Sequence, residues 1–217
     1  MSELAALSDR LAACYASVVH DVMRGMGLGD FTLPPRLRPL MPERRLAGPA
    51  FTILGETGAF DPHETLMAWT GLLSQCPADH VWCCQPMDDA VAHMGELSAE
   101  TLQAKGVRGA VADGMIRDAD FLLSIGFQAW GSGFTPRDVV GRWKPKATEV
   151  PITIGPVGIA PGDFLLGDRD GMVRIPRDRL TEVLEAAEAA MTAESAVRAA
   201  IRAGADPQRA YLEHGKF

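Results

Sequence analysis

The stretch MGELSAETLQAKGVRGAVADGMIRDADFLLSIGFQAW, residues 94–130, has the pattern helix, strand, turn, helix, strand. The first helix is expected to begin at Gly95, because acidic side chains fill its first turns and a glycine follows its last turn. Residues 109–112 (GAVA) are small and apolar, which is typical of a strand buried on both faces. An Asp-Gly turn then leads to a second helix at residues 117–126. This order predicts an α/β fold, in which ligands bind at the carboxyl ends of strands.

Three neighbouring groups in this unit offer complementary binding chemistry. The first backbone N–H groups of the helix that begins near Gly95 are free to bind a carboxylate. Arg117 offers a planar guanidinium to a second oxyanion, and Asp118 offers an oxygen ligand to a divalent metal. Together they would hold a 2-oxo acid by its carboxylate, its keto oxygen and a metal. His93 lies two residues before Gly95 and is expected at the border of this pocket.

The spacing of the charged residues carries a family resemblance. Twenty residues separate Glu96 from the dipeptide Arg117-Asp118. This resembles the acidic-x20-Arg-Asp signature of the HMG/CHA aldolase and RraA-like family, where HMG/CHA stands for 4-hydroxy-4-methyl-2-oxoglutarate and 4-carboxy-4-hydroxy-2-oxoadipate. Four later motifs are similar to the family as well: GSGFTPRD at 131–138, GRW at 141–143, PGD at 161–163 and DRDGMV at 168–173. The likeness extends roughly from His20-Asp21 to Arg177, and the order of its motifs makes it specific.

The resemblance implies a fold and an activity. The fold would be α/β, a swivelling β/β/α sandwich forming a single domain over residues 1–217 and assembled as a homotrimer or a homohexamer. The activity would be that of a class II, metal-dependent pyruvate aldolase. It would cleave a 4-hydroxy-2-oxo acid, of the 4-hydroxy-4-methyl-2-oxoglutarate or 4-carboxy-4-hydroxy-2-oxoadipate type, to pyruvate and a second oxo acid. Oxaloacetate decarboxylation, which also yields pyruvate enolate, is expected as a second activity.

The resemblance also implies a role for each site residue. Asp118 would hold the divalent metal, Mg²⁺ or Mn²⁺, and Arg117 would hydrogen-bond the keto oxygen as it becomes an enolate. Glu96 would position or activate a metal-bound water for proton transfer. The remaining expected substrate contacts are Gly95, Glu96, Leu97, Ser98 and His93. No lysine lies at this centre, so a Schiff-base aldolase is not favoured.

Three positions depart from the family pattern. Glu96 stands where the aldolases often have Asp, and its side chain is one methylene longer. Phe121 and Ser124 stand where acidic residues are common. These departures are expected to change the proton relay, the water network around the metal and the choice of substrate.

Composition excludes several classes of protein. The chain has 217 residues, 47% hydrophobic and 23% charged, as in an ordinary globular protein. No apolar run approaches the roughly 20 residues of a membrane span, and the acidic N-terminus is unlike a signal peptide, so the cytoplasm is expected. The net charge of -7 argues against non-specific nucleic-acid binding. A local cluster of four arginines is interpreted as a solvated loop: Arg36, Arg38, Arg44 and Arg45.

The cysteines and two glycine-rich motifs have plain interpretations. Four cysteines form no zinc-binding pattern and are interpreted as buried apolar side chains, with Cys83 and Cys84 on opposite faces of a strand. The motif GMGLGD at 25–30 follows a helix and lacks the spacing of a dinucleotide-binding loop. Asp168 and Asp170 lack the ligand spacing of a calcium loop, so a β-turn is predicted there.

The remaining elements follow from periodicity and turn residues. We predict helices at 3–25, 61–73, 178–203 and 207–214, and strands at 48–54, 79–85, 151–157, 164–166 and 172–175. Residues 131–150 are rich in Gly and Pro and predict a long lid-like loop. Its cations Arg137, Arg142 and Lys144 would contact a second acidic group of the substrate, an adjacent subunit, or solvent alone.

Two alternatives remain open at this point. Some RraA-like relatives are regulators that bind an RNA-degrading enzyme, and such a protein would not need the acid, Arg and Asp set. A different lyase or decarboxylase, acting on sugar-derived acids through the same metal enolate, is the other. A methyltransferase is not favoured, because no glycine loop for S-adenosylmethionine is present.

Overall fold

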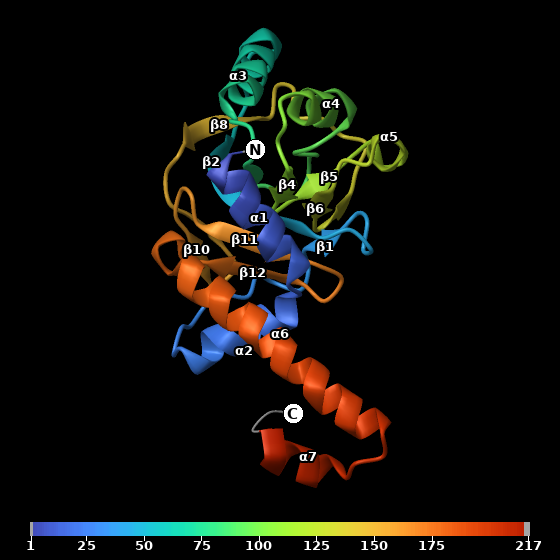
Figure 1. Cartoon of the computed structure of the whole chain (residues 1–217). Coiled ribbons are helices and arrows are strands. Elements are labelled where there is room, and N and C mark those ends of the chain that lie inside the picture. Colours follow the sequence, from blue (N-terminus) through green and yellow to red (C-terminus); the bar gives the residue numbers. More distant parts are fainter. Residues whose placement is uncertain (1, 215–217) are drawn as a thin grey trace.

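An eight-stranded sheet runs through the computed structural model, which describes residues 2–214 (Figure 1). Its strands are β1 (Arg38–Pro39), β2 (Leu46–Thr57), β3 (Val81–Gln85), β4 (Gly109–Ala112), β6 (Ala129–Gly131), β8 (Trp143–Thr148), β11 (Phe164–Gly167) and β12 (Met172–Ile175). The order is β1-β6-β4-β3-β2-β11-β12, and β8 also pairs with β2. Strands β6, β4, β3 and β2 are parallel, whereas the other four join antiparallel. Two small sheets pair β9 (Ile152–Ile154) with β10 (Val157–Ile159), and β5 (Met115–Ile116) with β7 (Gly133–Phe134).

Strand β2 links the two halves of the sheet. Its first part pairs with β11 and its last part with β8, with a register shift between Leu54 and Gly55. Most of its residues are buried, as expected for an apolar strand that is covered on both faces. Gly55 is needed at the shift, because the indole of Trp143 occupies the space that a Cβ would take. The β2–β8 pairing thereby closes one end of the sheet over the buried Trp143.

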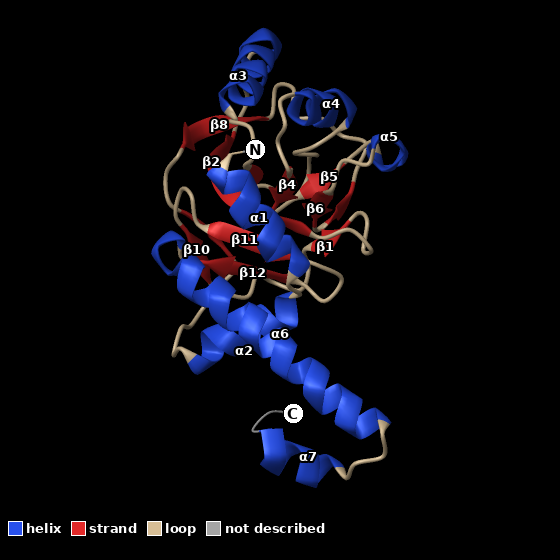
Figure 2. Cartoon of the chain, in the orientation of Figure 1, coloured by secondary structure: helices blue, strands red, loops and turns tan. Residues whose placement is uncertain are grey.

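Apart from the first helix, which packs on β2, the helices form two groups toward opposite ends of the molecule (Figure 2). The helices are α1 (Glu3–Ala13), α2 (Ala16–Gly25), α3 (Pro62–Gln75), α4 (Glu96–Ala104), α5 (Ala119–Ile125), α6 (Leu180–Arg202) and α7 (Pro207–His214), with a 3₁₀ turn at Arg177–Arg179. Helices α3, α4 and α5 lie at one end of the molecule in Figure 1, and α2 packs against α6 and β12 at the other. The last turns of α6, with α7, extend away from the sheet.

Alternate residues of the parallel strands supply two separate cores. Trp82 and Cys84 of β3 face the core beneath α3, α4 and α5, whereas Cys83 faces the core against the β9–β10 hairpin. This confirms the prediction that the two adjacent cysteines point to opposite faces. All four cysteines are free and buried, and burial raises the pKa of the Cys83 thiol to about 12. The thiols are therefore apolar packing groups rather than nucleophiles.

The predicted elements are largely confirmed, with three corrections. The helix predicted at 3–25 is two helices, because Asp168 accepts a hydrogen bond from the Ala16 N–H at 2.8 Å and begins α2 afresh. The loop predicted at 131–150 contains β7 and β8, and the strand predicted at 151–157 is the β9–β10 hairpin. The predicted turn at Asp168 is confirmed by two backbone hydrogen bonds with Gly171.

Two further predictions concern the C-terminal tail and membrane-spanning helices. The tail predicted from Gly204 to Phe217 lies in part outside the described residues, which end at 214. Within residues 2–214, none of the helices combines the length and the apolar character that a bilayer crossing requires.

Candidate functional site

Two short segments run side by side and bring the predicted site residues together. The His93 N–H donates to the Met115 carbonyl at 2.8 Å, and the Arg117 N–H donates to the Met94 carbonyl at 2.9 Å. These bonds place the N-terminus of α4 beside the N-terminus of α5. Gly95, which precedes α4, leaves room for this approach: a Cβ there would lie 2.8 Å from Asp118 Oδ2. The predicted juxtaposition of Gly95 with the Arg-Asp pair is thus present in the fold.

Asp118 is held in an uncommon backbone conformation with one carboxylate oxygen committed. Its φ is 55° and its ψ is 39°, the left-handed region that Asp adopts more readily than most residues. Its Oδ2 accepts a hydrogen bond from the Glu96 N–H at 3.0 Å and lies 3.4 Å from Arg117 Nε. Its Oδ1 has no protein partner among residues 2–214, and the side chain is 36% exposed. One oxygen therefore fixes the carboxylate, and the other is open to a ligand.

The place where the N-terminus of α4 meets Arg117 and Asp118 is called the corner below. Arg117 lies between two carboxylates at its edge. Its Nε is directed to Asp118, and its Nη1 lies 3.8 Å from Asp138 Oδ2. The side chain is 37% exposed, so the guanidinium is oriented by its neighbours but remains accessible. A half-exposed arginine held in this way is suited to bind an oxyanion that arrives from solvent.

The first turn of α4 contributes backbone donors. The Glu96 N–H is taken by Asp118, while the N–H groups of Leu97 and Ser98 belong to the turn that has no intrahelical acceptors. The Leu97 side chain is 74% exposed. The Ser98 hydroxyl accepts from Trp69 Nε1 at 2.9 Å on the inner side of the helix. Because the Ser98 hydroxyl is bonded to α3, the substrate contact predicted at this residue is left to its backbone N–H. The Glu96 carboxylate is partly exposed without a partner among the described residues.

His93 is buried behind the corner rather than exposed within it. Its imidazole has no exposed surface, its Nε2 lies 3.1 Å from Asp88 Oδ2, and its ring packs edge-on to Trp143. Burial lowers the pKa of His93, and the hydrogen bond with Asp88 opposes that shift. Asp88 also accepts the N–H groups of Ala90 and Val91. The imidazole thus ties down the loop that precedes Gly95, and its direct contact with a substrate stays a prediction.

The donor set at this corner suits a hard cation with few protein ligands. The described part of the chain contains no group of three or more His, Cys, Asp or Glu side chains able to hold a metal. A structural zinc site would need four such ligands. Mg²⁺ keeps several waters and binds through one or two carboxylates together with substrate oxygens. The single open oxygen of Asp118 therefore fits Mg²⁺ or Mn²⁺ that is completed by water and substrate.

Comparison with known proteins identifies the family. A family model described as RraA-like, Aldolase/RraA, matches residues 16–174, which is well over half of the chain. This range contains Glu96, Arg117 and Asp118. The chain belongs to the Aldolase/RraA family. The family predicted from the sequence is therefore confirmed.

Individual relatives of the Aldolase/RraA family carry different names. The chain is 28% identical over 85% of its length to a Halalkalibacterium halodurans protein, itself covered to 85%, named "Putative 4-hydroxy-4-methyl-2-oxoglutarate aldolase". Streptomyces coelicolor RraAS2, described as an unusual member of the RNase ES inhibitor RraA protein family, matches with a TM-score of 0.78 and 25% identity, over 88% of this chain and 95% of that one. A structure described under novel cellulases from gut-associated microbes matches with a TM-score of 0.84 and 30% identity, over 90% and 87%. These structures confirm the mixed α/β fold with its curled sheet.

Sequence reasoning missed two groups near the Aldolase/RraA motif. Asp138, beside Arg117, ends the GSGFTPRD motif, but no role at the site was predicted for it. Arg36, predicted as part of a solvated cluster, instead forms a bidentate ion pair with Asp113, with Nη2 2.7 and 2.8 Å from the two carboxylate oxygens. Asp113 directly follows β4, and its place at the carboxyl end of a parallel strand was the available signal.

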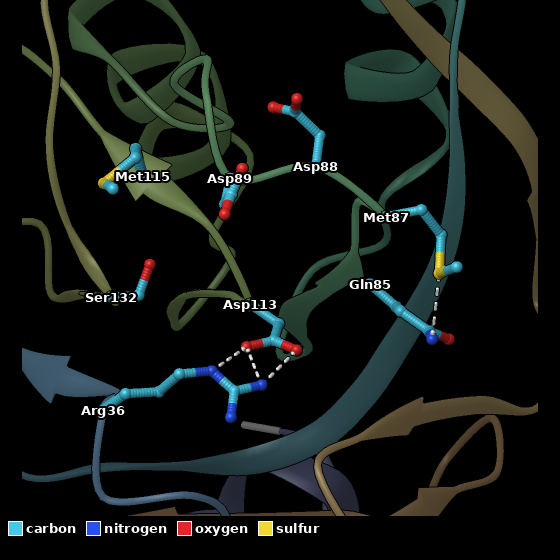
Figure 3. Close-up of a pocket in the computed structure, with 8 residues that line it drawn as sticks. All are labelled: Arg36, Gln85, Met87, Asp88, Asp89, Asp113, Met115 and Ser132. Atoms are coloured by element: carbon cyan, nitrogen blue, oxygen red, sulfur yellow. Dashed lines mark hydrogen bonds and ion pairs between the residues drawn. The ribbon is translucent and has the colours of Figure 1, made fainter.

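The Arg36–Asp113 pair lies in a cavity of about 580 Å³ next to the candidate site. Figure 3 shows Arg36 reaching across to Asp113, with Ser132, Met115 and Asp89 along one side and Gln85 and Met87 on the other. The cavity opens at the carboxyl ends of β3 and β4, where α/β proteins bind ligands.

The cations of the predicted lid differ in their surroundings. Lys144 Nζ lies 3.0 Å from Glu64 and 4.6 Å from the centre of the Phe60 ring. It is therefore a partner of α3 rather than an open cation. Arg137 and Arg142 are exposed, and their contact with a substrate or a second subunit stays a prediction.

Proposed function

We propose that this chain is a divalent-metal-dependent lyase that cleaves a 4-hydroxy-2-oxo acid to pyruvate and a second oxo compound. The observation that carries the proposal is the open oxygen of Asp118, held beside Arg117 and the free amides of α4. The family match and the aldolase name of the Halalkalibacterium relative support the same reaction class. The substrates suggested by that name are 4-hydroxy-4-methyl-2-oxoglutarate and its analogues.

The residues would act on the bond between C3 and C4 of the substrate. The amides of Leu97 and Ser98 bind the carboxylate, and Arg117 donates to the keto oxygen. When the bond breaks, its electron pair moves to C3 and the keto oxygen to give pyruvate enolate, and C4 becomes a carbonyl as its hydroxyl loses a proton. Glu96 accepts that proton through water, and C3 of the enolate later takes up a proton. A bound divalent metal would add positive charge at the carboxylate and keto oxygens.

Oxaloacetate offers a direct test of the metal. Loss of its β-carboxylate as CO₂ leaves the same enolate, so we expect magnesium-dependent release of pyruvate. The assay follows pyruvate with added Mg²⁺ and, separately, with a chelator. Equal rates in the two samples would remove the metal from the mechanism.

A second candidate function is regulation of an RNA-degrading enzyme. The likeness to RraAS2, described as a member of an RNase inhibitor family, favours it. A regulator needs no open carboxylate next to an arginine, so the geometry at Asp118 favours catalysis. A pull-down with an RNase of that class, set beside pyruvate release, separates the two functions. Binding without turnover would support the regulator.

The assembly and location expected from the sequence also belong to this proposal. Leu97 beside the site and Phe134 of β7 are large apolar side chains with 74% and 62% exposure, which is compatible with a subunit interface there, and the homotrimer or homohexamer stays a prediction. Four free cysteines without a disulfide suit a reducing compartment such as the cytoplasm.

A further inference from the structure

Strand β5 connects the cavity that contains the Arg36–Asp113 pair to the candidate site along the chain. Met115 lines the cavity, and Arg117 lies two residues further on. Ile116 between them is buried, whereas Met115 and Arg117 are both partly exposed. Arg117 directly follows β5, and two residues of extended chain span about 7 Å. The cavity is therefore within reach of the far end of a substrate whose keto group meets Arg117.

The side chains that line the cavity carry a net negative charge, because its arginine is paired with one aspartate and two further aspartates remain. The guanidinium of Arg36 makes a bidentate pair with Asp113, so the two charges offset each other. Asp89 keeps an unpaired carboxylate in the described structure, and Asp88 is bonded only through its Oδ2. The cavity therefore presents carboxylate oxygens, which accept hydrogen bonds and repel anions.

The other lining groups suit a neutral polar chain. The Ser132 hydroxyl has no partner among the described residues and can donate as well as accept. Met115 and Met87 add apolar, adaptable contacts. The volume of about 580 Å³ lies within the range of sites for small molecules.

We propose that this cavity binds the far end of the substrate, and that this end is a neutral polyhydroxylated chain rather than a second carboxylate. The substrate class is then a 3-deoxy-2-oxo sugar acid, whose C5 and C6 hydroxyls donate to Asp89. This inference rests on the proposed pyruvate lyase activity. It changes the expected substrate from a 2-oxo acid with two or three carboxylates to one with a single carboxylate.

The first step of the test reports on the lyase chemistry alone. Pyruvate has no far end, so magnesium-dependent exchange of its methyl protons in D₂O, followed by NMR, measures enolate formation without the cavity. If the exchange is absent, the proposed function fails and the substrate inference fails with it. If the exchange is present, the choice of substrate is decided separately by the second step.

The second step compares two six-carbon substrates with the same reacting end. One is 3-deoxy-2-oxohexonate, and the other is 4-hydroxy-2-oxohexanedioate, which ends in a carboxylate. We expect kcat/KM to be about tenfold or more higher for the neutral substrate, because only its end can donate to Asp89. Equal values, a preference for the diacid, or cleavage of neither compound would overturn the inference.

A matched pair of variants tests whether the cavity determines the preference for the neutral substrate. In Asp89→Asn the ratio of the two kcat/KM values should fall several-fold. Asp178→Asn removes the same charge from an exposed position outside the cavity and should leave the ratio unchanged. A ratio that is unaffected by Asp89→Asn would show that the cavity does not select the substrate.

Discussion

Asp118 and Asp168 both follow a short strand and both belong to motifs of the Aldolase/RraA family, but the protein uses them differently. Asp168 is 9% exposed; its Oδ2 accepts the Ala16 N–H at 2.8 Å and its Oδ1 accepts the Asp170 N–H at 3.0 Å. Asp118 is 36% exposed and uses only Oδ2. A carboxylate with both oxygens bonded stabilises a fold, whereas one with an open oxygen can bind a ligand.

The backbone conformations of Asp118 and Asp168 differ as well. Asp118 is held at a φ of 55°, which costs a non-glycine residue about 1 kcal/mol or more. The bond to the Glu96 N–H and the contact with Arg117 keep it in place. Asp168 stands outside the left-handed region. A strained residue with an open ligand oxygen is thus found at the candidate site and not at the structural turn.

The largest expected effect is that of Asp118→Asn. The amide keeps the size of the side chain and an acceptor for Glu96 but removes the charge that would hold a metal. We expect kcat for oxaloacetate to fall about 10³-fold, with the free energy of unfolding changed by less than about 1 kcal/mol. Kinetics and denaturant unfolding measure the two quantities. Unchanged kcat with a large loss of stability would place Asp118 in the same class as Asp168.

Gly95→Ala should have the next largest effect, because it acts through position alone. The added Cβ would lie 2.8 Å from Asp118 Oδ2 and 2.9 Å from Arg117 Cγ, so the pair must shift. A displacement near 1 Å at a reacting centre costs about 10²-fold in rate. Gly71→Ala is the matched control, since no atom lies within 4 Å of its added Cβ. Similar rates for the two variants would mean that the approach of α4 to Asp118 is not needed.

Asp168→Ala tests the structural side of the comparison. The change leaves the N–H groups of Ala16 and Asp170 without their acceptor, at a cost of about 2 kcal/mol in the free energy of unfolding. The kcat for oxaloacetate should stay within about twofold of the unmodified protein, because α2 is not part of the site. Asp178→Ala, at an exposed position, should change stability by less than about 0.5 kcal/mol. Loss of turnover without loss of stability in Asp168→Ala would contradict this assignment.

The same two aspartates show how far sequence reasoning reaches. The helix at 96–104 and the strand at 109–112 are local patterns, and both are present, as is the predicted approach of the α4 N-terminus to Asp118. The break before Ala16 was missed because its cap comes from Asp168, 152 residues away. Strand β8 was missed because it contains lysines and a proline and is formed by pairing with β2.

The contacts of charged side chains were the hardest to predict. Arg36 meets Asp113, and Arg117 meets Asp138, across distances in sequence that no periodic pattern spans. From residue type alone, Arg36 was predicted to contact solvent and Arg117 to contact substrate. Only the fold shows that Arg36 is neutralised by a carboxylate, whereas Arg117 remains partly open.

The smallest expected effect concerns His93, which is buried like Asp168 but adjoins the candidate site. Burial lowers the pKa of His93 in the folded state below its usual value near 6.5. Below that pH the unfolded chain binds a proton that the folded chain does not, so the free energy of unfolding should fall as pH decreases. The fall should be at most about 1.4 kcal/mol per pH unit and should stop below the folded pKa. Denaturant unfolding between pH 7.5 and 5.5 measures it.

His93→Gln should remove this part of the pH dependence, because the amide does not titrate in that range. His63→Gln, on the exposed side of α3, is the matched control and should retain the full dependence. If the free energy of unfolding falls with decreasing pH to the same extent in both variants, the titration belongs to other groups. A dependence that disappears only in His93→Gln would show that the loop before Gly95 is held by a neutral imidazole. The geometry at Asp118 would then weaken at acidic pH through its support rather than through its own carboxylate.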